Sequence, residues 1–284
     1  MAAVTVVKDE AVMLPRWVQH YGERLGVDHL VVIDNDSRDG STDDLAAEVR
    51  AWGELPGGSG FDRGRLQAAN QIGRELLERF DWVIFTDADE FLVVDPQFHD
   101  SFKHLLAVTS GAAVAPLALN VVQDLEAEGA LDPTRAVLEQ RSYAQFAEVM
   151  CKPSSKRLPI RWAHASHGLH GEYAVRSDLF LLHLKFADLD RLRLSAAHRH
   201  ALHLRDGRGG GSWQIDDVAE RFEARMRGSS FETAEEFDPA GIDLDALVVR
   251  QPGGHTWRTP KVGQLRSLDE EAVVRIPSRL RGSL

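Results

Sequence analysis

Short apolar runs alternate with helix-like spacings of apolar residues in the N-terminal third of the chain. Val4–Val7, His29–Ile33 and Trp82–Phe85 are almost entirely apolar, which is typical of strands buried on both faces of a sheet. Two intervening stretches, Leu14–Leu25 and Leu66–Phe80, place apolar residues three and four positions apart, as amphipathic helices do. This alternation predicts an α/β fold with a doubly wound, mostly parallel sheet.

A further helix is expected directly after the second strand. Ser41 with Asp44 three residues later resembles a capping box, and Leu45, Val49 and Trp52 would then share one helix face. The polar turn before Ser41 would lie at a strand-to-helix junction, where open α/β sheets bind ligands.

The periodicity weakens beyond Asp95 and Pro96. Residues 118–176 are expected to form a small antiparallel part with loops. The remaining elements are expected as helices at 102–108, 188–204 and 215–226 and as strands at 112–117 and 179–182.

These elements predict one domain over residues 1–206, with halves at 1–95 and 96–206. A linker and a helical or irregular C-terminal extension would follow at 207–284. The GRGGGS stretch, Gly207–Ser212, would be the linker or the hinge of a lid.

Composition narrows the class of protein. The 284 residues are 43% hydrophobic, as in ordinary globular proteins, and carry 33 basic against 44 acidic side chains, a net charge of −11. That charge argues against nucleic acid as a partner.

The lone cysteine, Cys151, gives no disulfide framework and favours a reducing compartment. No run approaches the ~20 apolar residues that cross a bilayer, and the N-terminus lacks a signal-peptide pattern. We therefore expect a cytoplasmic protein, with peripheral membrane attachment left open.

The candidate chemistry begins where the central predicted strand ends. Asp87, Asp89 and Glu90 follow Trp82–Phe85 directly. Carboxylates this close repel one another unless a cation lies between them. Mg²⁺ or Mn²⁺ suits oxygen ligands, and two aspartates would leave coordination positions for a diphosphate. The alternative is a solvated acidic turn.

The second polar turn, Asp34–Ser41, admits three interpretations. Its Gly40 and Arg38 do not fit the spacing of a calcium-binding EF-hand loop. An aspartyl-nucleophile phosphatase could use Asp34, although such an enzyme normally starts with that strand. In the third interpretation, parallel strands bring Asp34 and Glu10 near the metal turn, so that one crevice holds base, ribose and phosphates.

Histidines and basic residues supply further candidates. His183 and His167 could complete a manganese site, whereas His164, His167 and His170 could form a rival zinc site. Arg65 and Lys152 could pair with a diphosphate. The remaining aromatic and histidine candidates are Trp162 and Trp213, which could stack on a sugar or simply pack, and His198, His200 and His203, which suit a solvated helix face.

Several motifs together resemble a known family. The strongest are KDE (Lys8–Glu10), DNDSRDGS (Asp34–Ser41), AAN (Ala68–Asn70) and WVIFTDADEF (Trp82–Phe91). They resemble the nucleotide-binding half of family 2 glycosyltransferases, particularly the bacterial subgroup with a DxDEF motif. Weaker similarity continues through CKP (Cys151–Pro153), WAHASHG (Trp162–Gly168) and LLHLK (Leu181–Lys185).

The resemblance implies a GT-A fold, a nucleotide-sugar donor, most simply a UDP-sugar, and a divalent cation. By position, Glu10 and Asp34 would contact the nucleoside, and Asp39 would brace the turn. Asp87 and Asp89 would bind the metal, and Glu90 would orient the site. Lys8 and Asn70 also fall in the motifs expected around the donor, although Lys8 and Asp9 stand where the family usually has Arg and Asn.

The sequence thus predicts a metal-dependent glycosyltransferase that transfers a sugar to a saccharide or other hydroxyl acceptor. The general base stays open among Asp124, Glu126 and Glu172. One alternative is a nucleotidyltransferase, although Lys8–Glu10 stands where a Gly-rich loop would be expected. Another is a module that binds nucleotide-sugars without turnover.

Overall fold

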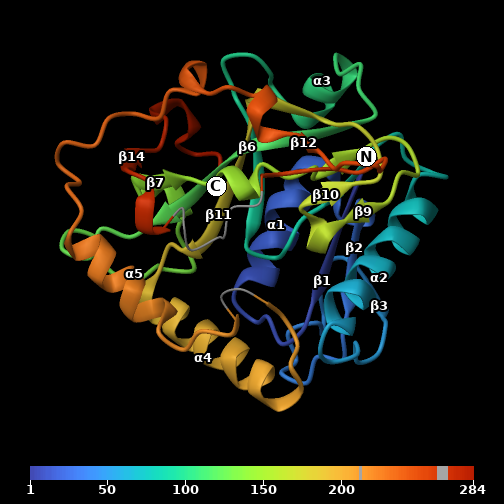
Figure 1. Ribbon diagram of the computed structural model, residues 1–284, viewed down its shortest axis with the longest axis horizontal. Coiled ribbons are helices and arrows are strands. Elements are labelled where there is room, and N and C mark those ends of the chain that lie inside the picture. The colour runs from blue at the N-terminus through green and yellow to red at the C-terminus, as the bar shows by residue number, and fades with distance from the viewer. Residues whose placement is uncertain (211–212, 261–267) are drawn as a thin grey trace.

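The computed structural model of the protein describes residues 1–210, 213–260 and 268–284. A ten-stranded mixed sheet forms its centre, and a four-stranded antiparallel sheet lies beside it (Figure 1). The helices are α1 (Met13–Leu25), α2 (Gly60–Leu76), α3 (Phe102–Ala107), α4 (Leu189–Asp206) and α5 (Val218–Arg227). The strands of the large sheet are β1 (Ala2–Val7), β2 (Leu30–Asp34), β3 (Glu48–Ala51), β4 (Val83–Phe85), β5 (Glu90–Val94), β6 (Ala113–Val122), β7 (Tyr143–Phe146), β8 (Ser155–Lys156), β11 (Ala174–Phe186) and β14 (Val273–Arg275). The small sheet contains β9 (Trp162–Ala163), β10 (Gly168–Leu169), β12 (Val249–Arg250) and β13 (Trp257–Arg258).

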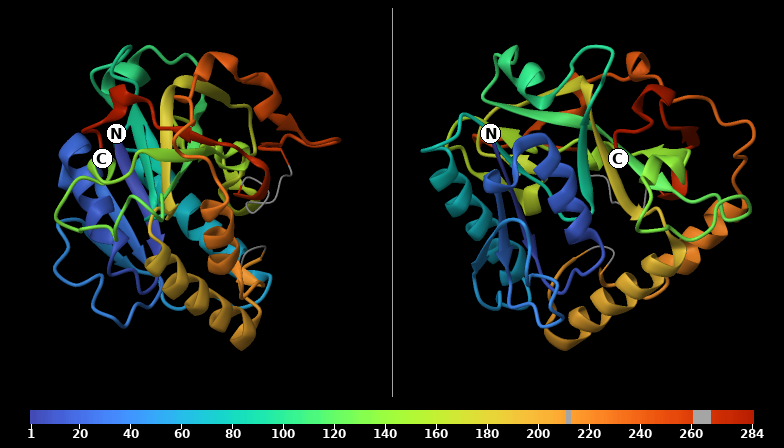
Figure 2. Two further views of the ribbon diagram at one scale, coloured as in Figure 1. Left: turned by 90° about the vertical axis from the view of Figure 1, so that its left-hand side faces the viewer. Right: turned by 180° about the vertical axis from the view of Figure 1, so that it is seen from behind.

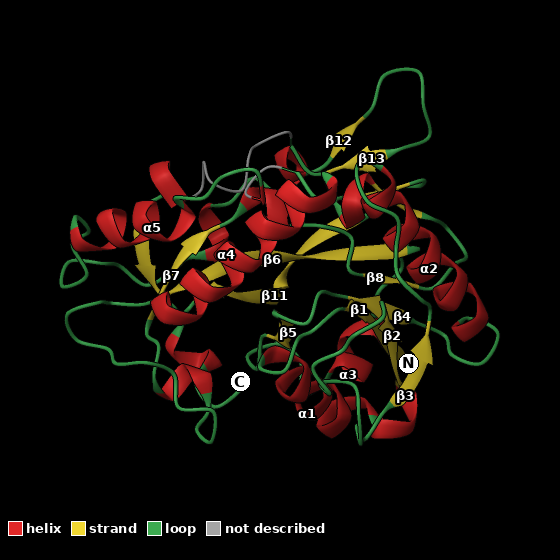
Figure 3. Ribbon diagram, turned by 90° about the horizontal axis from the view of Figure 1, so that it is seen from below, coloured by secondary structure: helices red, strands yellow, loops and turns green. Residues whose placement is uncertain are grey.

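The predicted parallel sheet is present in the N-terminal part, where neighbouring strands follow the order β4-β1-β2-β3. Val7 of β1 pairs with Asp34 of β2, and Val4 pairs with Phe85 of β4. The carboxyl ends of these strands therefore meet at one edge of the sheet. Helices α1 and α3 lie below the strands in Figure 3, and α4 passes in front of β6 and β11. The α/β fold class is confirmed.

The helix expected after the second strand is wrong, because Glu48–Ala51 forms β3 along the open edge of β2. The Ser41 hydroxyl accepts a hydrogen bond from the Glu10 backbone N–H instead of capping a helix. Asp44 has a φ of 53°, which interrupts a helical start. Pairing with β2 supplies backbone hydrogen bonds over this segment, and β-branched Val49 suits a strand.

The second half of the chain extends the sheet with mixed pairings. β11 runs parallel to β6 and antiparallel to β5, while β7 and β8 pair antiparallel with β6. Helix α4 begins just after β11, and α4 and α5 follow one another along one side of the molecule (Figures 1 and 2). Phe186 of β11 stacks on Phe222 of α5, in the apolar cluster that buries the inner faces of both helices.

The segment predicted as an extension contributes to both sheets. β14 pairs with β7 in the large sheet, and β13 pairs with β10 in the small one. Gly207 ends α4 with a φ of 70° in the left-handed region, which favours glycine. Residues 211 and 212 of the predicted linker lie outside the described residues. No helix in the described ranges combines the length and apolar character needed to span a bilayer.

Candidate functional site

The predicted site residues gather at the carboxyl edge of the parallel strands. Asp87 and Asp89 follow β4, Asp34 ends β2, and Lys8 to Glu10 follow β1. Because β1 is parallel to both neighbours, these turns lie side by side on one rim. This arrangement is the one expected of a ligand crevice in an α/β sheet.

Strand register places three polar side chains in one row beside the acidic turn. Glu90 of β5 pairs with His183 of β11, and His183 pairs with Asn120 of β6. His183 Nδ1 lies 2.7 Å from Asn120 Oδ1. An amide oxygen only accepts, so the Nδ1–H of His183 donates. The Nε2 atom of His183 lies 3.7 Å from Asp89 Oδ2.

Asp89, Glu90 and His183 form the one close group of three potential metal ligands within residues 1–210, 213–260 and 268–284, with ligand atoms within 4.8 Å of one another. All three side chains are buried. Burial alone would raise the pKa of Asp89, but the hydrogen bond and charge of His183 and the charge of Arg199 hold it well below its usual range. An ionised carboxylate beside an oriented imidazole nitrogen fits Mn²⁺.

Basic side chains neutralise the other acidic groups of this turn. Arg65 of α2 forms an ion pair with Asp87. Lys152 Nζ lies 2.6 Å from Glu90 Oε1 and 3.2 Å from Ser166 Oγ, and burial lowers the pKa of Lys152. The other Glu90 oxygen accepts from the Asp87 N–H at 3.1 Å. Glu90 therefore shapes the turn, and both predicted diphosphate-binding cations contact carboxylates.

The Asp34–Ser41 turn is held by Lys8 from the turn after β1 and by its own Asp34. Lys8 Nζ donates to the carbonyl oxygens of Asn35 and Asp36, at 3.0 and 2.8 Å. Asp34 Oδ1 accepts from the Ser37 N–H at 2.9 Å. These contacts hold the turn in place at the rim of the sheet. Lys8 therefore hydrogen-bonds the protein backbone in this structure.

Two of the predicted nucleoside-side carboxylates have structural partners. Asp39 Oδ1 accepts from the Ser41 N–H at 2.9 Å within its own turn. Glu10 Oε1 accepts from the Met13 N–H at 3.0 Å at the start of α1. The same oxygen lies 3.1 Å from a guanidinium nitrogen of Arg191.

Helix α4 supplies two arginines that sequence reasoning did not assign to the site. Arg191 pairs with Glu10, and Arg199 lies 3.7 Å from Asp89 Oδ2. Burial and the charge of Arg199 lower the pKa of nearby Lys185 to about 7. The only sequence signal was the density of basic residues in a predicted helix, and such a pattern usually marks a solvated face.

The base candidates are not brought together. Asp124 follows β6 on the site side, four residues beyond Asn120 and so ~13 Å farther along at the usual rise of a strand. Glu126 is exposed in the same turn. Glu172 is exposed before the start of β11, whereas His183 lies near its end. The β6 partners of Ala174 and His183 are Val114 and Asn120, which places the start of β11 ~20 Å from His183 by the same rise. The structure therefore separates Glu172 from the acidic turn.

Asn70 and His167 contact the protein backbone. The Asn70 amide donates to the Trp162 carbonyl at 3.1 Å and accepts from the Trp162 N–H at 2.8 Å, so it anchors β9. His167 Nδ1 lies 2.6 Å from the Val149 oxygen, and burial lowers its pKa to about 3. His167 is not a member of the Asp89, Glu90 and His183 group.

The rival zinc site is not formed. His164 contacts Gln251, His170 contacts Thr256 and His167 contacts the Val149 carbonyl, so each histidine has a different partner. In α4, His198 is exposed as predicted, but His200 and His203 are half-buried and bond the carbonyls of Trp213 and Arg208. The solvated-face prediction is therefore wrong for these two.

The two candidate stacking tryptophans differ in exposure. Trp162 is buried, with Lys156 Nζ 3.5 Å from its ring centre, and so belongs to the core. Trp213 is half-buried against Phe61, with ring centres 5.6 Å apart.

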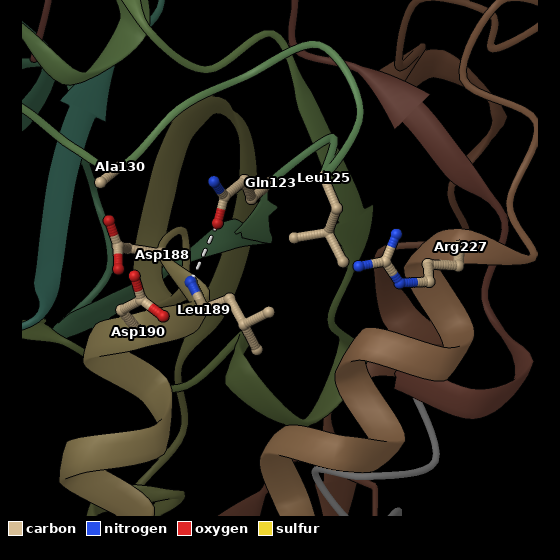
Figure 4. Close-up of a pocket in the computed structure, with 7 residues that line it drawn as sticks. All are labelled: Gln123, Leu125, Ala130, Asp188, Leu189, Asp190 and Arg227. Carbon is tan, nitrogen blue, oxygen red and sulfur yellow. Dashed lines mark hydrogen bonds between the residues drawn. The ribbon is translucent and has the colours of Figure 1, made fainter.

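A separate cavity of about 170 Å³ lies where β6 and β11 end and α4 begins (Figure 4). Gln123 Oε1 accepts from the Leu189 N–H at 2.9 Å on its wall, while Asp190 and Arg227 lie on opposite sides. None of the acidic-turn residues lines this cavity.

Comparison with known proteins gives limited similarity. No family profile and no curated protein matches the sequence. The chain is similar to the mannosyltransferase PcManGT from Pyrobaculum calidifontis in complex with GDP-Man and Mn²⁺, with 14% identity over 81% of this chain and 76% of that chain and a TM-score of 0.36.

It is also similar to S. aureus TarS 1-349 in complex with UDP-GlcNAc, with 10% identity over 78% and 70% of the two chains and a TM-score of 0.32. Against another TarS structure the chain covers 42% of that protein, with 12% identity over 80% of this chain and a TM-score of 0.33. Similarity this low carries no argument about activity, which must come from the side chains of this protein.

Proposed function

We propose that the protein is a metal-dependent glycosyltransferase that transfers a sugar from a nucleotide-sugar to a hydroxyl acceptor. One observation carries the proposal: the Asp89, Glu90 and His183 group lies on the same sheet rim as Asp34. On that rim a nucleoside would lie beside a cation and a diphosphate.

Asp89 and His183 would hold Mn²⁺ or Mg²⁺, with Asn120 fixing the imidazole orientation. Asp87 would join them if Arg65 moved off its carboxylate. A divalent ion bound there supplies positive charge beside the departing diphosphate. Glu90, held by Lys152, keeps the turn in shape through the Asp87 N–H.

The reaction breaks the bond between the anomeric carbon and the diphosphate oxygen, and the electron pair leaves with the nucleoside diphosphate. The acceptor oxygen bonds the anomeric carbon, and its proton passes to a general base. Asp124 is the proposed base, because it alone of the three candidates is buried and follows β6 on the site side. Its Oδ1 accepts two backbone N–H groups, which fixes the carboxylate.

The donor is proposed to be a UDP-sugar and the acceptor a saccharide or other hydroxyl compound. Lys8, Glu10, Asp34, Asp39 and Asn70 would form or brace the nucleoside side. We further propose a cytoplasmic location, because the one cysteine is buried and unpaired.

The test is release of nucleoside diphosphate from UDP-, GDP- and dTDP-sugars with Mn²⁺, with and without a panel of saccharide acceptors. Asp89→Ala and His183→Ala should abolish release, while Asp100→Asn, at an exposed position, should leave it unchanged. Asp124→Asn should lower transfer at least about 100-fold with little change in donor affinity. Binding without turnover in the wild-type protein would overturn the enzymatic proposal and identify a nucleotide-sugar-binding module.

A further inference from the structure

Helix α4 runs along the rim and directs one arginine at each acidic turn. Arg191 contacts Glu10 next to the turn after β2, and Arg199 contacts Asp89 after β4. The two residues are eight positions apart, ~12 Å along a helix.

Arg199 is the cation at the metal turn that can most easily change partner. Arg65 and Lys152 pair with Asp87 and Glu90, with side chains 12% and 3% exposed, and Lys152 lies 2.6 Å from its carboxylate. Arg199 is 28% exposed and 3.7 Å from Asp89. A long, partly solvated ion pair contributes little stability, so its loss is readily offset by a new contact.

If a divalent ion and a diphosphate bind at the acidic turn, Arg199 could exchange its carboxylate partner for a phosphate. Asp87, Glu90 and Asp89 form ion pairs with Arg65, Lys152 and Arg199 respectively. A divalent ion at Asp89 would compete directly with the Arg199 guanidinium for the same carboxylate. The displaced guanidinium would lie next to the phosphates that bind the ion, and arginine pairs well with phosphate oxygens.

We propose that Arg199 is a binding and catalytic residue that exchanges Asp89 for the β-phosphate of the nucleotide-sugar. The inference rests on the proposed function and adds a residue to it. A nucleotide-sugar diphosphate carries two negative charges, and the departing nucleoside diphosphate gains a third when the glycosidic electron pair leaves with it. Arg199 would stabilise that developing charge from the helix side of the rim.

The experiment compares Arg199→Gln and Arg199→Lys with the matched control Arg193→Gln. Arg193 lies on the same helix but pairs with Asp190 and Glu223 at the surface. Calorimetry measures the affinity of each folded variant for UDP and for UMP in the presence of Mn²⁺. Electron paramagnetic resonance measures Mn²⁺ affinity without nucleotide.

We expect Arg199→Gln to weaken UDP binding at least about tenfold and UMP binding less than threefold, because UMP lacks the β-phosphate. Mn²⁺ affinity without nucleotide should stay equal or rise, since a competing cation has left Asp89. Arg199→Lys should recover part of the UDP affinity, and Arg193→Gln should match the wild-type protein.

Unchanged UDP affinity in Arg199→Gln, in a wild-type protein that binds UDP, would overturn this inference alone and leave Arg199 as a counter-charge for Asp89. Equal losses for UMP and UDP would also overturn it. A wild-type protein that binds none of UDP, GDP or dTDP with Mn²⁺ would overturn the proposed function and this inference together.

Discussion

The buried ion pair of Lys152 and Glu90 gives the sharpest prediction about stability. The two charged groups are 2.6 Å apart, and their side chains are 3% and 1% exposed. Removing one partner of such a pair leaves an uncompensated buried charge, which costs about 3–5 kcal/mol. Lys152→Met should therefore lower the free energy of unfolding by that amount, a large part of the 5–15 kcal/mol typical of a domain.

A double-mutant cycle separates the charge pair from loss of packing. Glu90→Gln alone leaves a buried ammonium and should also cost several kcal/mol, whereas Lys152→Met with Glu90→Gln leaves neither charge. The double variant should be more stable than the sum of the single losses predicts, by at least ~2 kcal/mol. Lys103→Met, at an exposed position, should change stability by less than ~0.5 kcal/mol.

Urea unfolding followed by tryptophan fluorescence and by circular dichroism measures these values, and agreement of the two signals tests two-state behaviour. A loss below ~1 kcal/mol for Lys152→Met, or strictly additive single losses, would refute the account of a buried charge pair that shapes the acidic turn.

Three further predictions concern metal binding, pH and thiol reactivity. Asn120→Leu should weaken Mn²⁺ binding about 10- to 100-fold by releasing the His183 imidazole; unchanged affinity would show that Asn120 does not position a metal-binding His183. Burial lowers the pKa of His20 to about 3 from 6.5, so between these values the unfolded chain binds the extra proton. The protein should lose stability as pH falls from 6.5 towards 3, by up to about 5 kcal/mol from this group, and unfolding of His20→Gln should depend less on pH. Burial raises the pKa of the Cys151 thiol to about 12, so a thiol reagent at pH 8 should react only after denaturation; rapid labelling of the folded protein would contradict this.

Local sequence patterns predicted the elements that have strong periodicity and dense burial. The helix at Met13–Leu25 and the strands at Ala2–Val7 and Leu30–Asp34 were expected within a few residues, and the helix expected at Leu66–Phe80 lies at Gly60–Leu76. Their side-chain spacing reflects one buried face or two, which the chain encodes locally. The acidic turn Asp87–Glu90 was also predicted from local sequence, because it directly follows the apolar strand β4.

The error at Glu48–Ala51 shows where local signals stop. A capping-box pattern and three spaced apolar residues favoured a helix, yet the segment pairs with β2. The hydrogen-bonding edge of β2 is available only after the sheet has formed. No pattern within the segment itself can therefore predict its pairing with β2.

The amino-acid sequence by itself determined the α/β order of elements, the burial of their apolar faces and the presence of carboxylates at a strand end, since each depends on neighbours in the chain. Only the tertiary structure decided which side chains those carboxylates meet. His183 joins Asp89 through the registers of β5, β11 and β6, and Arg199 reaches it from a helix more than one hundred residues away. Such contacts depend on strand pairing and helix packing between distant segments, and residue type and spacing do not specify them.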